Sequence, residues 1–235
     1  MINHSIETIK EEIKKAAISS GRNPEEVMLI AVTKTRTTDE MKTVEELGLI
    51  NFGENRVQEL EKKYHAFGDH INWHIIGHLQ RNKVKYIIHK VKLIHSVDSL
   101  KLATAIDTEA AKENKIIHIL LQVNIANEDT KFGLTVAEVI PLLKEIALLK
   151  NIKVQGLMTI APYTEDPEEN RKYFRGLKNL SVDINSQKID NIYIKELSMG
   201  MTNDYIVAVE EGSTMIRVGT GIFGNRDYNR NKEVL

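Results

Sequence analysis

Hydrophobic residues along the chain fall into short runs that are separated by stretches with helical spacing. Eight runs have the length of β-strands, and they cover residues 27–34, 49–55, 72–77, 92–98, 116–124, 154–159, 193–199 and 214–220. Amphipathic helical patterns lie between most of them, at residues 38–47, 54–66, 99–113, 135–149, 167–181 and 202–211. Strands that alternate with helices indicate βαβ units and a parallel sheet.

Residues typical of helix ends support these boundaries. N-cap residues precede three of the helices: Thr38, Asp98–Ser99, and Thr135 with Glu138 three positions later as a capping box. Gly48 and Gly212 stand where a glycine commonly follows the last turn of a helix.

An extra helix is expected before the first strand, because apolar residues recur there at helical spacing: Ile6, Ile9, Ile13 and Ala17. The strand–helix units continue over residues 1–235 without a break in composition, so we expect a single domain that closes into a (β/α)8 TIM barrel. An open doubly wound sheet is the alternative, although such sheets usually have fewer strands. The polar segment 162–167 is a candidate for a mobile flap.

Charge and composition exclude several classes of protein. Lys and Arg total 32 against 33 Asp and Glu, so no net charge favours nucleic acid or an anionic membrane surface. No apolar stretch reaches the roughly 18 residues of a membrane span, and Glu7, Glu11 and Glu12 interrupt any signal-peptide core. The absence of cysteine excludes disulfides and thiolate sites, which fits a cytoplasmic location.

Candidate chemistry lies where the predicted strands end, since a TIM barrel builds its active site there. Lys34 is the unusual residue at these ends, because it follows the apolar run VMLIAVT and shares a strand face with Met28, Ile30 and Val32. If that face points inward, burial beside a cation favours the neutral amine that Schiff-base chemistry needs. The alternative is a lysine that extends from the strand end into water.

Arg217 is the candidate cation, on the same face of the last strand as Met215 and Gly219. An inward arginine beside a pyridine nitrogen would keep that nitrogen unprotonated, whereas an outward one would form a salt bridge. The segments Ser198–Thr202 and Gly219–Gly224 follow the last two strands, where barrels frequently bind phosphate. A glycine-rich turn without a ligand is the alternative. GTGIFG also fits G-x-G-x-x-G, but a dinucleotide-binding motif should open the first βαβ unit.

Histidines His74 and His78 have the spacing of metal ligands, but no third ligand is near them in sequence. We therefore expect no metal, with one histidine packed in a strand and the other in a loop. Glu54–Asn55 is either a helix start or a cofactor contact, and Asp98 is expected to cap a helix.

Several separated motifs together resemble one known family. They are IAVTKT, NFGENRVQEL, WHIIGHLQRNK, HSVDS, LLQVNIANEDTKFGL, GLMTIAP, ELSMGMTND and GSTMIRVGTGIFGNRDY. In this order, across nearly the whole chain, they are similar to the pyridoxal phosphate homeostasis proteins, whose fold resembles the N-terminal barrel of alanine racemase.

The resemblance implies that the cofactor is pyridoxal 5′-phosphate (PLP), with Lys34 as its Schiff-base lysine and Arg217 near the pyridine nitrogen. It also implies two further sets of residues: Ser198, Gly219 and Thr220 at the phosphate, and Asn55, His78, Met158 and Met199 lining the pocket. Members of the family act in vitamin B6 homeostasis, so the expected function is to hold PLP inside the cell and deliver it to apo PLP-dependent enzymes. We expect a monomer.

A PLP-dependent racemase-like enzyme is the main alternative function. Racemisation needs a second base, which in fold relatives is a tyrosine from a separate domain. Tyr163, Tyr205 and Tyr228 are conceivable bases here, but no pattern distinguishes one of them. Since losing a general base removes roughly 10²–10⁴-fold in rate, we favour a carrier over an enzyme. A phosphosugar-type barrel enzyme without PLP is a third hypothesis.

Overall fold

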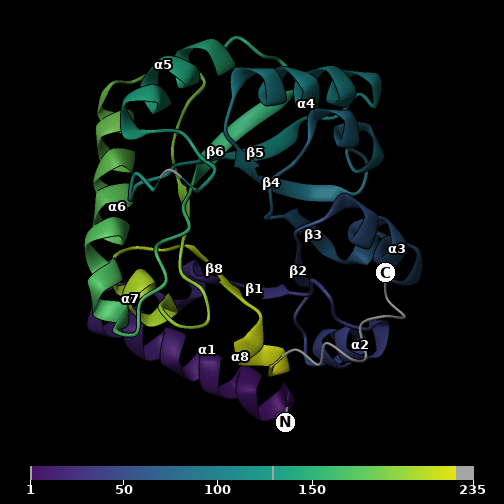
Figure 1. The fold of residues 1–235 in the computed structure, drawn as a ribbon, viewed down its shortest axis with the longest axis vertical. Coiled ribbons are helices and arrows are strands. Elements are labelled where there is room, and N and C mark those ends of the chain that lie inside the picture. Colours follow the sequence, from purple (N-terminus) through teal and green to yellow (C-terminus); the bar gives the residue numbers. More distant parts are fainter. Residues whose placement is uncertain (1, 129, 226–235) are drawn as a thin grey trace.

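The computed structural model describes residues 2–128 and 130–225, and its centre is a closed barrel of parallel strands (Figure 1). The strands are β1 Met28–Val32, β2 Asn51–Glu54, β3 Asn72–Ile75, β4 Val91–Val97, β5 Ile117–Gln122, β6 Ile152–Met158, β7 Glu196–Ser198 and β8 Met215–Val218. They follow one another around the barrel in sequence order, and β8 pairs with β1. The predicted (β/α)8 barrel and its eight strands are confirmed.

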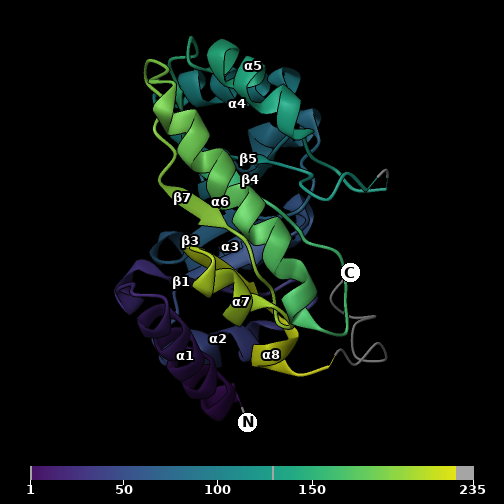
Figure 2. The same ribbon diagram turned by 90° about the vertical axis from the view of Figure 1, so that its left-hand side faces the viewer.

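Helices surround the barrel. They are α1 Ile2–Ser19, α2 Thr38–Glu46, α3 Val57–Phe67, α4 Leu100–Lys112, α5 Val136–Ile146, α6 Arg171–Ser186, α7 Tyr205–Glu210 and α8 Thr220–Phe223. Short 3₁₀ turns add η1 Pro24–Glu26, η2 Gly68–His70, η3 Arg81–Tyr86 and η4 Pro167–Asn170. Figure 2 shows α6 crossing the outer surface from the side of α5 to that of α7.

The predicted N-terminal helix is present as α1, and it packs against α7 and α8 beside the place where the barrel closes (Figure 1). Its buried residues are the predicted ones, Ile6, Ile9, Ile13 and Ala17, together with Ala16. Gly21 follows α1 with a φ of 72°, a left-handed conformation that glycine adopts without strain.

Two of the three predicted N-caps are confirmed and one is displaced by a residue. Ser99 accepts from the Leu102 amide, and Thr135 forms the capping box with Glu138. Helix α2 is capped by Thr37 rather than Thr38, because the Thr37 hydroxyl accepts from the Glu40 amide while the Glu40 carboxylate accepts from the Thr37 amide. Adjacent threonines offer two possible caps, and only Thr37 has a glutamate three residues later.

The hydrophobic residues form two layers. A small cluster fills part of the barrel interior and consists of Met28, Ile30, Leu93, Leu120, Met158 and Met215. A larger cluster lies between the outer face of the sheet and the helices, and the side chains of Trp73, Phe52 and Phe174 are its largest fully buried members. The interior position of Met28 and Ile30 agrees with the inward face predicted for the first strand.

Segment 162–167, the predicted flap, is connected to its neighbours by hydrogen bonds that include two from asparagine side chains to its backbone carbonyls. The Asn170 side chain donates to the Pro162 carbonyl at 2.9 Å, and the Asn203 side chain donates to the Thr164 carbonyl at 2.9 Å. Asn170 directly precedes α6 and Asn203 lies in the loop after β7, so the backbone of the segment is joined to both places.

Candidate functional site

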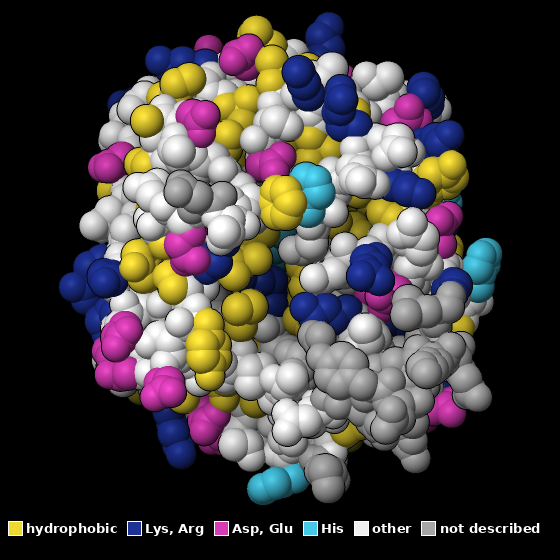
Figure 3. Space-filling view, viewed as in Figure 1, with side chains coloured by type: hydrophobic (Ala, Val, Ile, Leu, Met, Phe, Trp, Pro, Cys, Tyr) yellow, Lys and Arg dark blue, Asp and Glu magenta, His cyan; other side chains and the backbone are white. Residues whose placement is uncertain are grey.

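Lys34 lies at the C-terminal end of β1, where the strand turns toward α2. The register pairs Ile30 with Arg217 and Ala31 with Val218, so the chain beyond β1 runs beside Gly219 and Thr220. A Cβ atom added at Gly219 would lie 3.4 Å from the Val32 Cβ, which shows how close the two segments are. The Lys34 side chain is half-buried. Figure 3 views the face that carries α8 and shows a central hollow with Lys and Arg side chains in and around it.

Arg217 projects into the barrel, which is the inward of the two directions considered from the sequence. Its side chain is 3% exposed, and its guanidinium donates to the Ser198 hydroxyl at 2.5 Å and to the Thr159 carbonyl at 2.9 Å. Burial lowers the pKa of Arg217 to about 10, and the carboxylate of Asp204 partly opposes this. The guanidinium therefore remains a cation at neutral pH, buried inside the barrel.

A chain of hydrogen bonds continues from Arg217 through the barrel interior. The Ser198 hydroxyl contacts His95 Nδ1 at 2.9 Å, and His95 Nε2 contacts His74 Nδ1 at 3.0 Å. Arginine can only donate, so the arrangement that pairs most groups has Ser198 donating to His95 and His95 donating to His74. This leaves an N–H on His74 Nε2, which has no hydrogen-bond partner.

Both histidines of this chain are neutral. Burial lowers the pKa of His74 from 6.5 to about 3, with a smaller contribution from Lys92. Burial also lowers the pKa of His95 well below its usual range, and the neighbouring His74 and Arg217 add to the effect. Arg217 is thus the cation at one end of a neutral hydrogen-bonded chain.

The loops after β7 and β8 come together, as the predicted phosphate site requires. The hydroxyls of Thr202 and Thr220 are 3.2 Å apart, and the Gly221 amide donates to the Thr202 hydroxyl at 3.2 Å. Gly200 has a φ of 92°, and a Cβ atom there would lie 2.6 Å from the Ala208 Cβ, so only glycine fits. The result is a cradle of hydroxyl and backbone N–H donors, which suits a phosphate dianion.

Ser198 lies apart from this cradle. Its hydroxyl is fully buried between Arg217 and His95, on the inside of the barrel. Gly219 and Thr220, the other two predicted phosphate residues, are the N-cap and the first residue of α8, directly after β8 at the same end of the barrel.

The predicted pocket-lining residues divide among three environments. Met158 belongs to the cluster inside the barrel, whereas Met199 packs in the outer layer between the sheet and the helices. Asn55 follows β2 in close contact with Gly77 after β3, where an added Cβ atom would meet the Asn55 carbonyl oxygen at 2.6 Å. His78 directly follows Gly77 in the loop after β3.

His78 bridges two loops at this end of the barrel. Its ring stacks on Phe132, with ring centroids 4.1 Å apart and planes inclined by 15°. Its Nδ1 lies 3.8 Å from the Asp98 carboxylate. As predicted, His74 is packed in a strand and His78 is in a loop. Among the described residues, no group of three or more His, Cys, Asp or Glu side chains is placed to hold a metal ion.

The tyrosines considered as bases occupy different surroundings. The ring of Tyr163 is 88% exposed, and the hydroxyl of Tyr205 donates to Glu12 of α1 on the outside of the barrel. Tyr228 lies outside the described residues.

Two groups of polar residues were not predicted from the sequence as groups. The first is His95, which pairs with His74 across neighbouring strands, and only the strand register reveals this. The second is Glu54, Glu59 and Lys63, which form a buried ion cluster outside the barrel. The spacing of Glu59 and Lys63 by four residues on a helix was the available signal, but such pairs are usually exposed. Glu54 is therefore neither a helix start nor a member of the barrel interior.

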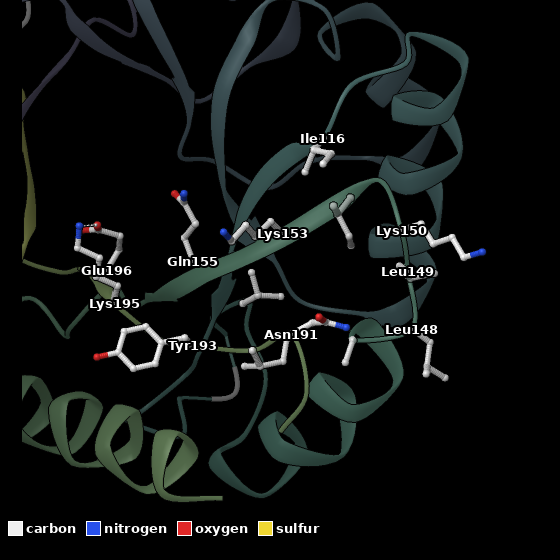
Figure 4. Close-up of a pocket in the computed structure, with 14 residues that line it drawn as sticks. Ile116, Leu148, Leu149, Lys150, Lys153, Gln155, Asn191, Tyr193, Lys195 and Glu196 are labelled. Carbon is white, nitrogen blue, oxygen red and sulfur yellow. Dashed lines mark ion pairs between the residues drawn. The ribbon is translucent and has the colours of Figure 1, made fainter. Parts of the chain in front are cut away.

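A broad groove occupies the opposite end of the barrel, near the N-terminal ends of β5 to β7 (Figure 4). Ile116, Leu148 and Tyr193 lie around it, and Lys195 forms an ion pair with Glu196 at 3.6 Å. The residues that line it include neither Arg217 nor the threonines of the Thr202–Thr220 cradle. No helix in the described part of the chain is long and apolar enough to cross a membrane.

Comparison with known proteins gives consistent matches. Residues 6–227 match the family model described as alanine racemase, N-terminal domain. The chain is 43% identical to a pyridoxal phosphate homeostasis protein of Aquifex aeolicus, over 94% of this chain and 96% of that protein. It is 35% identical to the Escherichia coli protein of the same name, over 97% of this chain and 98% of that one.

Solved structures agree with this assignment. PipY of Synechococcus elongatus, in a structure with PLP bound, has a TM-score of 0.83 and 31% identity, and the match covers 95% of this chain and all of that one. An alanine racemase of Clostridium difficile shares the fold, with a TM-score of 0.72 at 16% identity, and the match covers 57% of that chain. The chain belongs to the family of pyridoxal phosphate homeostasis proteins, within the alanine racemase N-terminal domain family.

Proposed function

We propose that this protein binds PLP through a Schiff base on Lys34 and acts in PLP homeostasis. One juxtaposition carries the proposal: the pairing of β1 with β8 brings the segment of Lys34 to the same strand ends as Arg217 and the Thr202–Thr220 cradle. PLP supplies, when bound, an aldehyde that condenses with a lysine amine with loss of water, and a phosphate dianion. The PLP-bound relative and the names of the curated relatives support the same ligand.

The residues present fit such a ligand. The hydroxyl of Thr220 and the backbone around Gly219 are assigned to the phosphate, together with Thr202. Ser198 remains a predicted phosphate ligand, although its contacts with Arg217 and His95 favour a place beside the pyridine nitrogen instead. Asn55, His78 and Met158 are assigned to the rest of the pocket. Met199, which packs outside the sheet, could contribute only through its backbone.

Arg217 supports a carrier more than a catalyst. A guanidinium has donors and no acceptor, so it pairs with an unprotonated ring nitrogen, and the electron-withdrawing power of the ring then stays low. Neither Tyr163, which is largely exposed, nor Tyr205, which donates to Glu12, is placed as a second base. We propose that the protein holds PLP in exchangeable form in the cytoplasm, as a monomer, and delivers it to apo PLP-dependent enzymes.

Borohydride trapping tests the proposal. Reduction of the PLP-loaded protein followed by peptide mass spectrometry should place the cofactor on Lys34. The Lys34→Ala variant should lose the visible Schiff-base absorbance and keep its far-UV circular dichroism, while Lys92→Ala, a change to an exposed lysine of β4, should behave like the wild type. Trapping on another lysine would contradict the assignment of Lys34, and the absence of any trapped PLP would contradict the proposal and favour a phosphosugar-type barrel.

A racemase-like activity is the second candidate, because the chain shares its fold with an alanine racemase. Incubating the PLP-loaded protein with L-alanine in D₂O, with chiral analysis, separates the two functions. The carrier proposal expects no sustained racemisation and a measurable transfer of PLP to an apo-enzyme. Sustained racemisation that requires Lys34 would favour the enzyme.

A further inference from the structure

A buried ion cluster lies directly behind the segment of Lys34, on the outer side of the sheet. It consists of Glu54 at the end of β2 and of Glu59 and Lys63 on α3. These residues are 0%, 6% and 4% exposed, respectively. Lys63 Nζ lies 2.6 Å from Glu54 Oε1 and 3.4 Å from Glu59 Oε2.

The cluster holds the peptide group on each side of Lys34. On the N-terminal side, Lys63 Nζ donates to the Thr33 carbonyl at 2.7 Å. On the C-terminal side, the Thr35 amide donates to Glu59 Oε2 at 2.7 Å. The Thr33 hydroxyl also donates to Glu54 Oε1 at 2.6 Å. Both backbone groups next to Lys34 are therefore bound by side chains that are themselves linked.

The backbone held in this way is strained. Thr35 has a φ of 62°, in the left-handed region that a β-branched residue rarely adopts. Such a conformation persists only where its surroundings enforce it, and it is typical of functional sites. The amide of the strained residue is the group that Glu59 accepts from, so the cluster is placed to enforce this turn.

Stability alone is a weak explanation for the cluster. Three charged groups that are buried away from water lose hydration, and apolar residues of similar size often serve a core as well or better. The distinctive feature is where the donors and acceptors point: two of them are used on the peptide groups flanking a single residue, Lys34.

We propose that Glu59 and Lys63, anchored by Glu54, are positioning residues that fix the backbone of Lys34 so that its amine meets the PLP aldehyde. This inference rests on the proposed function of Lys34. A displacement of about 1 Å at a reacting group can reduce reactivity on the order of 10²-fold, so a fixed turn is a requirement for efficient Schiff-base formation and not only for folding.

The test removes the acceptor for the Thr35 amide with Glu59→Met and compares it with Val139→Ala, which truncates a fully buried residue of α5, a helix that packs mainly against α4 and not against α3. Stopped-flow absorbance measures Schiff-base formation with PLP. We expect Glu59→Met to slow it about tenfold, the loss associated with one hydrogen bond to a charged group. Hydrogen exchange of the Thr35 amide should accelerate in the PLP-free variant.

A second change separates positioning from a general loss of stability. Thr35→Gly removes the conformational strain, because glycine adopts a positive φ freely. In the Glu59→Met background, Thr35→Gly should restore a large part of the rate of Schiff-base formation. In the Val139→Ala background, the same change should not increase that rate. Equal rates in the wild type and Glu59→Met, or no restoration by Thr35→Gly, would overturn the inference. Absence of trapped PLP on wild-type Lys34 would instead refute the proposed function, so the two failures are distinguishable.

Discussion

His74 gives the sharpest prediction of pH-dependent stability. Its pKa is lowered by burial from 6.5 to about 3, so in the folded protein it stays neutral at pH values where the unfolded chain binds a proton. Protonation then favours the unfolded state. The contribution of His74 to stability is complete above about pH 6.5 and is lost progressively as the pH falls toward 3.

The magnitude follows from the pKa difference. Each pH unit below 6.5 lowers the free energy of unfolding by about 1.4 kcal/mol for one such group, until the folded pKa is reached. Between pH 7 and pH 4.5, the proton uptake of His74 in the unfolded chain should therefore lower the free energy of unfolding by about 3 kcal/mol. Carboxylates also titrate in this range, so a comparison with a variant that lacks only this histidine is needed.

The variant His74→Gln isolates the effect, because the glutamine carbonyl can accept from His95 Nε2 but does not titrate. Urea unfolding at pH 7 and pH 4.5 gives the free energy of unfolding of each protein. The wild type should lose about 3 kcal/mol more than His74→Gln over this range. Equal losses would show that His74 is not buried as a neutral base, and the inferred direction of the hydrogen-bond chain to Arg217 would fail with it.

Three further predictions concern the same end of the barrel and its surroundings. Gly200→Ala places a Cβ atom 2.6 Å from that of Ala208 at a positive φ, so it should lower the free energy of unfolding by about 2 kcal/mol in urea and weaken PLP binding. Unchanged PLP affinity would show that this loop does not contribute to the proposed phosphate site. Phe132→Ala removes the stack on His78 and should speed PLP release to an apo-enzyme by about fivefold, while Phe132→Tyr should release it at the wild-type rate. Thr135→Ala removes an N-cap and should lower the free energy of unfolding by about 1 kcal/mol with PLP binding unchanged; altered binding would reveal a link between α5 and the site.

The sequence predicts the barrel well because local patterns determine it. Strand runs, the α1 face and the Thr135 capping box all depend on residues close together in the chain, and each is found where expected. Alternation along β8 correctly placed Arg217 on the same face as Met215, but the sequence left open whether that face points inward, and the structure decides this.

Features that depend on strand register could not be predicted. His95 meets His74 because β3 and β4 are neighbours, and their pairing includes a shift between Trp73 and His74 that no local pattern encodes. The outward direction of Met199 does not depend on register: Met199 directly follows Ser198, so alternation along the strand places the two side chains on opposite sides of the sheet. Glu59 and Lys63 have the spacing of an exposed helix pair, and only their tertiary contacts distinguish them from one.

Because β1 pairs with β8, the two parts of the proposed PLP site come together only late in synthesis and folding. Lys34 is synthesised early, whereas Gly219 and Thr220 emerge from the ribosome only after all eight strands have been made. Contacts between such distant parts of a chain form late, because the chain loses conformational entropy on closing the loop before the strand pairing stabilises it. A nascent chain would therefore carry the proposed Schiff-base lysine for most of its synthesis without the proposed phosphate anchor, and under this proposal only the closed barrel would capture the cofactor.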